Sequence, residues 1–178
     1  MAVLVEGISV IVRVAAIHLK FRGGWDGFKN NTPNSTLCAD NELACVVFMA
    51  PDDVRFYIEY LEECGLAFIA DGRAVDIVVV DQMHGPMTPC DWAEFADVPI
   101  ASSGESTVLA CRLKGSKWGQ VFKPNGWTYE QSLRCSHGFV PSGKEDKSLS
   151  FLRHEGAVDV YLDRVTGKEI FVGRTGKV

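Results

Sequence analysis

The stretch LACVVFMAPDDVRFYIEYLEECG, residues 43–65, sets the fold class, because a run of apolar residues typical of a buried strand leads directly into an amphipathic helix. Pro51 suits the first position of a helix, and Asp52 and Asp53 place negative charge at the positive end of its dipole. Gly65 supplies a left-handed stop. The inward-facing positions are Val54, Ile58, Leu61 and Cys64, with Tyr57 alongside. The pattern predicts a helix over residues 51–64.

The sequence on either side of this helix predicts strands and one long loop. Residues 8–16 keep an apolar face with period two, which predicts a long and central first strand. Residues 22–41 break all periodicity, which predicts a functional or mobile loop. Apolar runs at 66–70 and 74–80 flank Asp71-Gly72-Arg73, a hairpin-type turn signal.

The second half of the chain repeats the strand pattern. Residues 107–113 alternate in polarity, residues 114–150 are poorly periodic, and strands at 158–163 and 169–173 form a hairpin with Gly167 as its left-handed residue. About eight strands and one firm helix, with one or two short helices, predict an α+β fold on a mostly antiparallel sheet with a C-terminal β-hairpin. We expect a single domain, 1–178, with 1–97 and 106–178 as candidate structural halves.

Bulk composition excludes several classes of partner. Eighteen Lys and Arg against 23 Asp and Glu give a net charge of −5, so neither nucleic acid nor an anionic membrane is an expected partner. The apolar N-terminus carries Glu6 and Arg13, which argues against a signal peptide, and we expect a cytoplasmic protein. Six scattered cysteines without a C-x-x-C pair predict reduced core thiols, no structural zinc site and no cofactor.

The stretch DQMHGPMTPCDW, residues 81–92, carries the main candidate site for chemistry. Its second half reads as a helix start, with Thr88 as the N-cap, Pro89 at the first position and Asp91 as the capping-box acid. A short helix carrying Trp92, Phe95 and Ala96 on one face would follow. Cys90 would then lie in the first turn, where the helix dipole stabilises a thiolate.

A catalytic hypothesis uses Cys90 as nucleophile, His84 as base and Asp81 as the group that orients the imidazole, as in acyl transfer. Six residues of extended chain separate His84 from Cys90 by about 20 Å unless the chain turns. The favoured alternative is structural: Asp81 caps a strand end, His84 lies on the surface and Cys90 packs under the helix. A metal site of His84, Cys90 and either Asp81 or His137 is a third hypothesis, but the spacing matches no known pattern.

Large aromatic residues beside loops suggest a binding surface. Four tryptophans, Trp25, Trp92, Trp118 and Trp127, lie in or next to loops, and such rings anchor protein interfaces at small entropic cost. They can equally close the ends of the sheet over the core. Together with Phe28, Asp91 and Glu94 they form the candidate partner-binding set, whose acids would suit a basic protein.

These observations favour a non-catalytic protein that acts by binding another protein, of the inhibitor or toxin-neutralising (immunity) kind. The alternatives are a Cys/His-dependent hydrolase or transferase that uses Cys90 and His84, and a small-molecule binder lined by Trp25 and the residues after VDIVVV.

Overall fold

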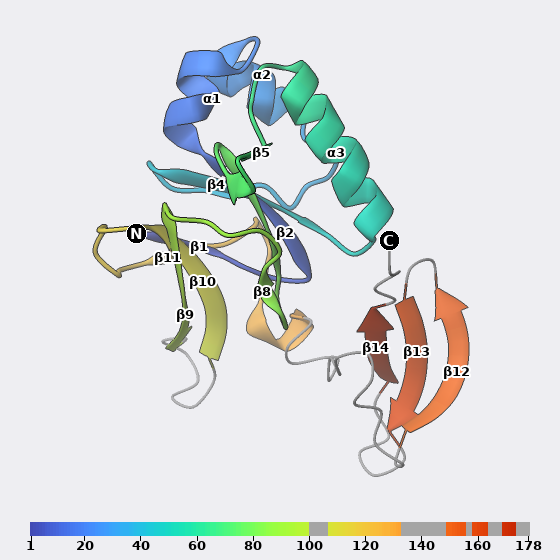
Figure 1. Ribbon diagram of the computed structural model, residues 1–178. Coiled ribbons are helices and arrows are strands. Elements are labelled where there is room, and N and C mark those ends of the chain that lie inside the picture. Colours follow the sequence, from blue (N-terminus) through green and yellow to red (C-terminus); the bar gives the residue numbers. More distant parts are fainter. Residues whose placement is uncertain (100–106, 133–148, 156–157, 164–168, 174–178) are drawn as a thin grey trace.

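The computed structural model describes residues 1–99, 107–132, 149–155, 158–163 and 169–173 and shows an α+β fold built on mostly antiparallel sheets, as predicted (Figure 1). The central sheet has the order β3-β4-β2-β7-β8. Its strands are β2 (Ile8–Arg13), β3 (Cys38–Ala39), β4 (Leu43–Phe48), β7 (Ile77–Asp81) and β8 (Gly85–Pro86). β2 pairs antiparallel with both β4 and β7, so it is central, as expected.

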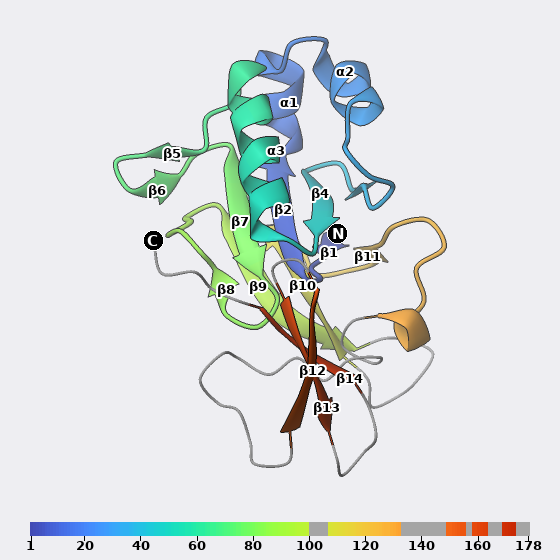
Figure 2. The same ribbon diagram turned by 90° about the vertical axis from the view of Figure 1, so that its right-hand side faces the viewer.

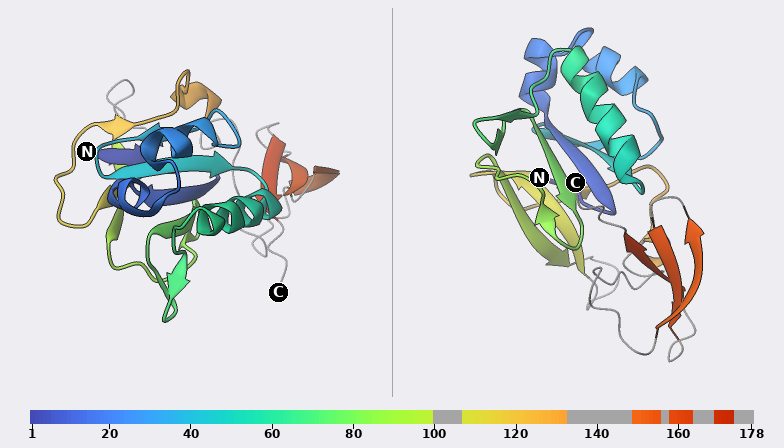
Figure 3. Two further views of the ribbon diagram at one scale, coloured as in Figure 1. Left: turned by 90° about the horizontal axis from the view of Figure 1, so that it is seen from above. Right: turned by 45° about the vertical axis from the view of Figure 1, so that its right-hand side comes forward.

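Three helices cover one face of the central sheet (Figures 2 and 3). They are α1 (Val14–Lys20), α2 (Gly24–Asn30) and α3 (Pro51–Glu63). Val10 and Val12 of β2 point to this side and join a core cluster with all three helices. α3 confirms the predicted helix, and Gly65 after it has the expected left-handed backbone, with φ 105°.

A second sheet, of order β11-β1-β10-β9, covers the opposite face of the central sheet. Its strands are β1 (Ala2–Leu4), β9 (Ala93–Pro99), β10 (Thr107–Leu113) and β11 (Val121–Phe122). Ile11 of β2 points to this side, so β2 is buried on both faces. Since β9 pairs with β10, residues on both sides of 100–106 share one sheet. The division into domains stays a prediction.

The remaining strands form hairpins. β5 (Ile69–Ala70) and β6 (Arg73–Ala74) confirm the turn at Asp71-Gly72, where φ is 50° and 72°. β12 (Leu149–Glu155), β13 (Val158–Asp163) and β14 (Glu169–Gly173) form a separate antiparallel sheet that contains the predicted C-terminal hairpin. Gly167 lies outside the described residues. A short 3₁₀ helix, η1 (Tyr129–Gln131), follows β11.

Three predictions of local structure were wrong. The first strand ends at Arg13 rather than at residue 16, because the chain then turns into α1, whose Ala15-Ala16 pair favours a helix. The predicted loop 22–41 contains α2, which Phe28 anchors in the core, and β3. No helix begins at Pro89: residues 89–92 are irregular, and strand β9 follows from Ala93, because Phe95 pairs with Cys111 of β10 and sheet pairing overrides the local capping signals.

The outer edge of β4 is closed by side chains. Thr36 Oγ1 accepts a hydrogen bond from the Val47 N–H at 2.8 Å, and Asn34 Nδ2 donates to the Val47 carbonyl at 2.9 Å. Asn34 Oδ1 in turn accepts from the Thr36 backbone N–H at 3.0 Å. These bonds replace a neighbouring strand beyond the end of β3 and fix the segment that faces α3.

Candidate functional site

Asp81 and His84 lie together at the tight turn between β7 and β8. The Nδ1 atom of His84 is 2.9 Å from Asp81 Oδ1. The same oxygen accepts the backbone N–H groups of Met83 at 2.8 Å and His84 at 3.0 Å. Asp81 therefore holds the turn, and the His84 side chain is about half exposed (49%). The pair has the geometry in which a carboxylate orients an imidazole.

Cys90 does not join this pair in any contact. After Gly85 the chain runs back along β7: the Met87 N–H bonds the Val79 carbonyl, and the Pro89 carbonyl accepts from the Ala74 N–H. This path carries Cys90 toward the opposite end of β7 from His84, about 20 Å away for six residues of extended chain.

The surroundings of Cys90 do not favour a thiolate. The thiol is half-buried and packs against the core between the two sheets. Burial raises its pKa above the ordinary value, and this outweighs the backbone N–H groups of Trp92 and Ala93, which lower it. Because no helix begins at Pro89, no helix dipole opposes the effect of burial.

A metal site has no support among the residues that the structure describes. No group of three or more His, Cys, Asp or Glu side chains in that part of the chain is placed to hold an ion. His137 and Cys135 lie outside it.

Each tryptophan has a contact of its own within the protein. Trp25 stacks on Phe28 with ring centroids 5.8 Å apart, and Trp92 Nε1 donates to the Ala74 carbonyl at 3.1 Å. Trp118 lies beneath the guanidinium of Arg112 at 4.5 Å. Trp127 Nε1 donates to Glu6 Oε2 at 2.9 Å.

The two acids of the predicted partner-binding set are also engaged: Asp91 pairs with Arg73 at 2.5 Å and Glu94 with Arg112 at 2.5 Å. The seven residues of the set lie on different elements, α2, the segment before β9, β9 itself and the loops that follow β10 and β11. Of the seven, only Trp127 lines one of the three cavities described next.

A groove along α3 is a hollow of the described surface that could take a ligand. Three adjoining cavities of about 470, 390 and 230 Å³ form it. The first two share Asn34, Phe48 and Asp53, and the last two share Glu6, Thr36 and Val47. We call this row of adjoining cavities, from Tyr60 to Trp127, the α3 groove.

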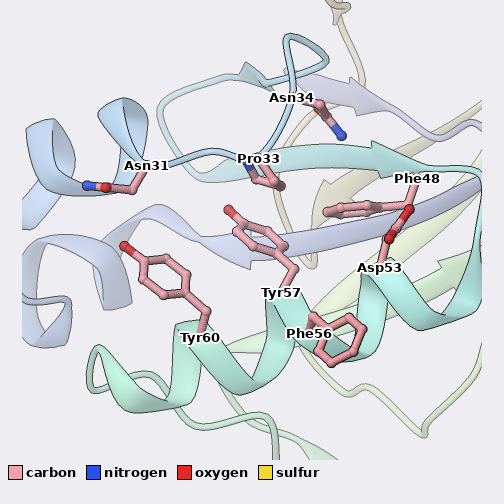
Figure 4. A pocket seen from close by; sticks show the side chains of 8 residues that line it. All are labelled: Asn31, Pro33, Asn34, Phe48, Asp53, Phe56, Tyr57 and Tyr60. Atoms are coloured by element: carbon pink, nitrogen blue, oxygen red, sulfur yellow. The ribbon is translucent and has the colours of Figure 1, made fainter.

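Figure 4 shows the largest cavity of the α3 groove from close by. One wall is a face of α3 with Asp53, Phe56, Tyr57 and Tyr60, and the opposite wall is the segment Asn31–Asn34. Phe48, from the end of β4, lies between the two walls. The cavity is thus lined by four aromatic rings with a carboxylate at one end.

The charge on α3 is strongly negative. Five acids stand against one base, Arg55, in this helix; the acids are Asp52, Asp53, Glu59, Glu62 and Glu63. Arg55 pairs with Asp52 at 3.4 Å. In the part of the chain that the structure describes, no cation lies within ion-pair distance of Asp53, so its charge is available to a ligand.

Tyr57 carries a buried hydroxyl in the wall of this cavity. The residue is only 5% exposed, and its hydroxyl has no hydrogen-bond partner among the described residues. Burial raises the pKa of the phenol well above its ordinary value, and neighbouring Tyr60 raises it further. The group is therefore a hydrogen-bond donor throughout the physiological pH range.

The sequence-based site missed the α3 groove. The prediction treated α3 only as a core helix and took its inward stripe from Val54, Ile58, Leu61 and Cys64, with Tyr57 alongside. A helix that rests on a sheet by one face, with Tyr57 in the core, does not need Phe56 and Tyr60 as well, and Phe56 is 59% exposed. That surplus of aromatic residues, spaced three and four apart beside Asp53, was the available signal.

No protein-family model, no curated protein and no solved structure matches this chain. Among the helices described by the structure, none combines the length and apolar character needed to cross a bilayer.

Proposed function

We propose that this protein acts without catalysis, by binding a basic segment of another protein in the α3 groove. The observation that carries the proposal is the row of adjoining cavities beside α3, lined by the exposed ring of Phe56, the partly exposed ring of Tyr60 and the carboxylate of Asp53, on a helix with five acids. Aromatic anchors with a charged rim are the usual composition of protein interfaces.

The sign of the charge selects the partner. A net charge of −5 and the excess of acids on α3 attract a basic surface and steer its approach. An enzyme that acts on a polyanion carries such a surface, and an acidic protein that covers it blocks the substrate. We therefore propose the inhibitor or toxin-neutralising class as the finer function.

The test is affinity capture of partners from native extract with wild-type protein and with Phe56→Ala. Phe56 is 59% exposed, so its truncation removes groove surface without opening the core. Leu19→Ala on α1, where Leu19 is 82% exposed, is the matched control. We expect a stoichiometric protein that is retained by wild type and by Leu19→Ala, and is depleted about tenfold by Phe56→Ala.

Salt gives a second readout of the same complex. Retention should fall between about 0.05 M and about 0.5 M salt, because the Debye length shrinks and the acidic surface is screened. A partner held equally by both variants, or no stoichiometric partner at all, would contradict the proposal.

A further inference from the structure

We infer that the largest cavity of the α3 groove, between Asp53 and Tyr60, binds one arginine side chain of the partner, with Asp53 taking the guanidinium and Tyr57 donating to a peptide carbonyl. The inference rests on the proposed function and names the chemistry that this part of the groove recognises.

The spacing along α3 suits one side chain of an extended peptide. Asp53, Phe56, Tyr57 and Tyr60 stand at positions i, i+3, i+4 and i+7, so they share one face of the helix. Seven residues of helix span about 10 Å, the length of about three extended residues. A long side chain can thus lie along the aromatic rings with its charged end at Asp53 (Figure 4).

The chain itself shows how it holds a guanidinium. Arg112 donates to Glu94 Oε2 at 2.9 Å through Nε and lies over the ring of Trp118 at 4.5 Å. Arg55 lies over the ring of Phe56 at 4.9 Å while pairing with Asp52. In both cases a carboxylate and an aromatic face bind the same cation.

The groove face of α3 has the same two components, a carboxylate and aromatic rings. Asp53 has no ion-pair partner among the described residues, and the exposed ring of Phe56 and the partly exposed ring of Tyr60 line the same cavity. Arginine fits this arrangement better than lysine, because a planar guanidinium stacks on a ring while its edge donates two hydrogen bonds to a carboxylate.

The hydroxyl of Tyr57 supplies an independent reason to expect a ligand. A buried hydroxyl without a partner is unfavourable, and the chain retains it in the wall of the cavity. Pro33, on the opposite wall of the cavity, lies across from the ring of Tyr57 (Figure 4). The hydroxyl is covered in the free protein and stays protonated, so it can donate to a carbonyl of the bound peptide once the ring turns toward the groove.

The experiment is NMR titration of the isotope-labelled full chain with three peptides that differ at one position, Gly-Gly-Arg-Gly-Gly and its lysine and citrulline counterparts. Citrulline keeps the shape of arginine and removes the charge. We expect saturable shifts at the backbone amides of Asp53, Tyr57 and Tyr60 with the arginine peptide. The lysine peptide should bind about threefold more weakly, and the citrulline peptide about tenfold more weakly.

Two variants separate recognition from folding. Asp53→Asn should weaken the arginine peptide about tenfold, whereas the matched control Asp52→Asn, in the same helical turn, should leave its affinity unchanged. Tyr57→Phe should weaken it about fivefold, yet leave the thermal midpoint equal or higher, because it removes a buried unpartnered hydroxyl. Unfolding therefore cannot explain the loss.

The outcomes distinguish this inference from the proposed function. Equal affinity for the three peptides, no saturable shift, or equal losses in Asp52→Asn and Asp53→Asn overturns the arginine site. The proposed function survives such a result if Phe56→Ala still loses the captured partner. If wild-type protein also captures no stoichiometric partner, or if Phe56→Ala retains the partner as well as wild type does, both the arginine site and the proposed function are wrong.

Discussion

Asp76 is the most constrained charged residue of the core. Its side chain is 2% exposed and accepts two bonds from Lys20 Nζ, at 2.9 and 2.8 Å, and one from the Ala67 N–H at 2.9 Å. The carboxylate thereby ties α1 to the segment that follows α3. If this charge is removed, Lys20 Nζ and the Ala67 N–H lose a charged acceptor at a buried position.

We expect Asp76→Asn to lower the free energy of unfolding by about 2 kcal/mol. Asp91→Asn breaks the exposed pair with Arg73 and should cost less than about 1 kcal/mol, so it serves as the control. Urea unfolding of the two variants measures the difference. Equal costs would mean that the Asp76 network contributes no more than a surface pair.

Cys90 allows a second prediction for a single residue. Because burial raises the pKa of its thiol above the ordinary value, little thiolate forms near neutral pH. Alkylation by iodoacetamide, followed by peptide mass mapping from about pH 6 to about pH 10, should show a rate for Cys90 that still rises beyond pH 9. A rate that reaches half its maximum near pH 7 would restore the nucleophile hypothesis.

Among the elements, α3 depends on the glycine that ends it. Gly65 has φ 105°, and a Cβ there would lie 2.6 Å from the Lys20 carbonyl oxygen, so the end of α3 packs directly on the end of α1. Gly72 in the β5–β6 turn also has a positive φ, 72°, but a Cβ there would meet nothing within 4 Å.

These two glycines should therefore respond differently to alanine. Gly72→Ala should cost about 1 kcal/mol from backbone strain alone. Gly65→Ala should cost at least about 2 kcal/mol, since strain adds to a clash with backbone. Thermal and urea unfolding of both variants make the comparison, and equal losses would show that α1 and α3 separate easily.

The elements that could be predicted from the sequence are those whose local signals agree with their packing. α3 and the β5–β6 turn were predicted because their local signals, Pro51 and Gly65 in one case and Asp71-Gly72 in the other, agree with their packing. α1 was missed because Val14 and Ala16 happen to continue the period of β2. A helix and a strand can bury the same residues over so short a stretch.

The remaining errors came from packing between distant segments. α2 is Gly-rich and a poor helix former, yet Phe28 meets the ring of Phe21 edge-on at 5.6 Å, and Gly27 lets α2 approach the Arg22 carbonyl. β9 exists because β10 lies beside it. The α3 groove likewise needs a wall, Asn31–Asn34, that is far from the helix in sequence. None of these pairings is encoded in a local pattern.

At the scale of the whole molecule, buried thiols and phenols make stability depend on alkaline pH. The pKa of Cys45 is raised by its hydrogen bond with Cys38 and by burial, and the pKa values of Cys111 and Tyr57 are raised mainly by burial. In the unfolded chain these thiols lose protons near about pH 8.5 and the phenol near about pH 10. Above those values the unfolded state binds fewer protons than the folded state.

The free energy of unfolding should therefore be constant from about pH 7 to about pH 8 and fall as the pH rises further. Urea unfolding in the presence of a reductant, up to about pH 10, measures it. Cys111→Ala should make the decline less steep, because one of the shifted groups is gone. A flat or rising curve would contradict burial of these groups.

The closure of the β4 edge by Asn34 and Thr36 determines which atoms of a bound peptide the protein can recognise. Because the backbone of Val47 already bonds these side chains, an incoming peptide in the α3 groove cannot pair with this part of β4 as an added strand. Strand addition reads mainly main-chain atoms and tolerates many sequences. Without strand addition at this place, recognition depends on the side chains of the bound peptide. The protein should therefore discriminate sharply between peptides of similar shape and different sequence.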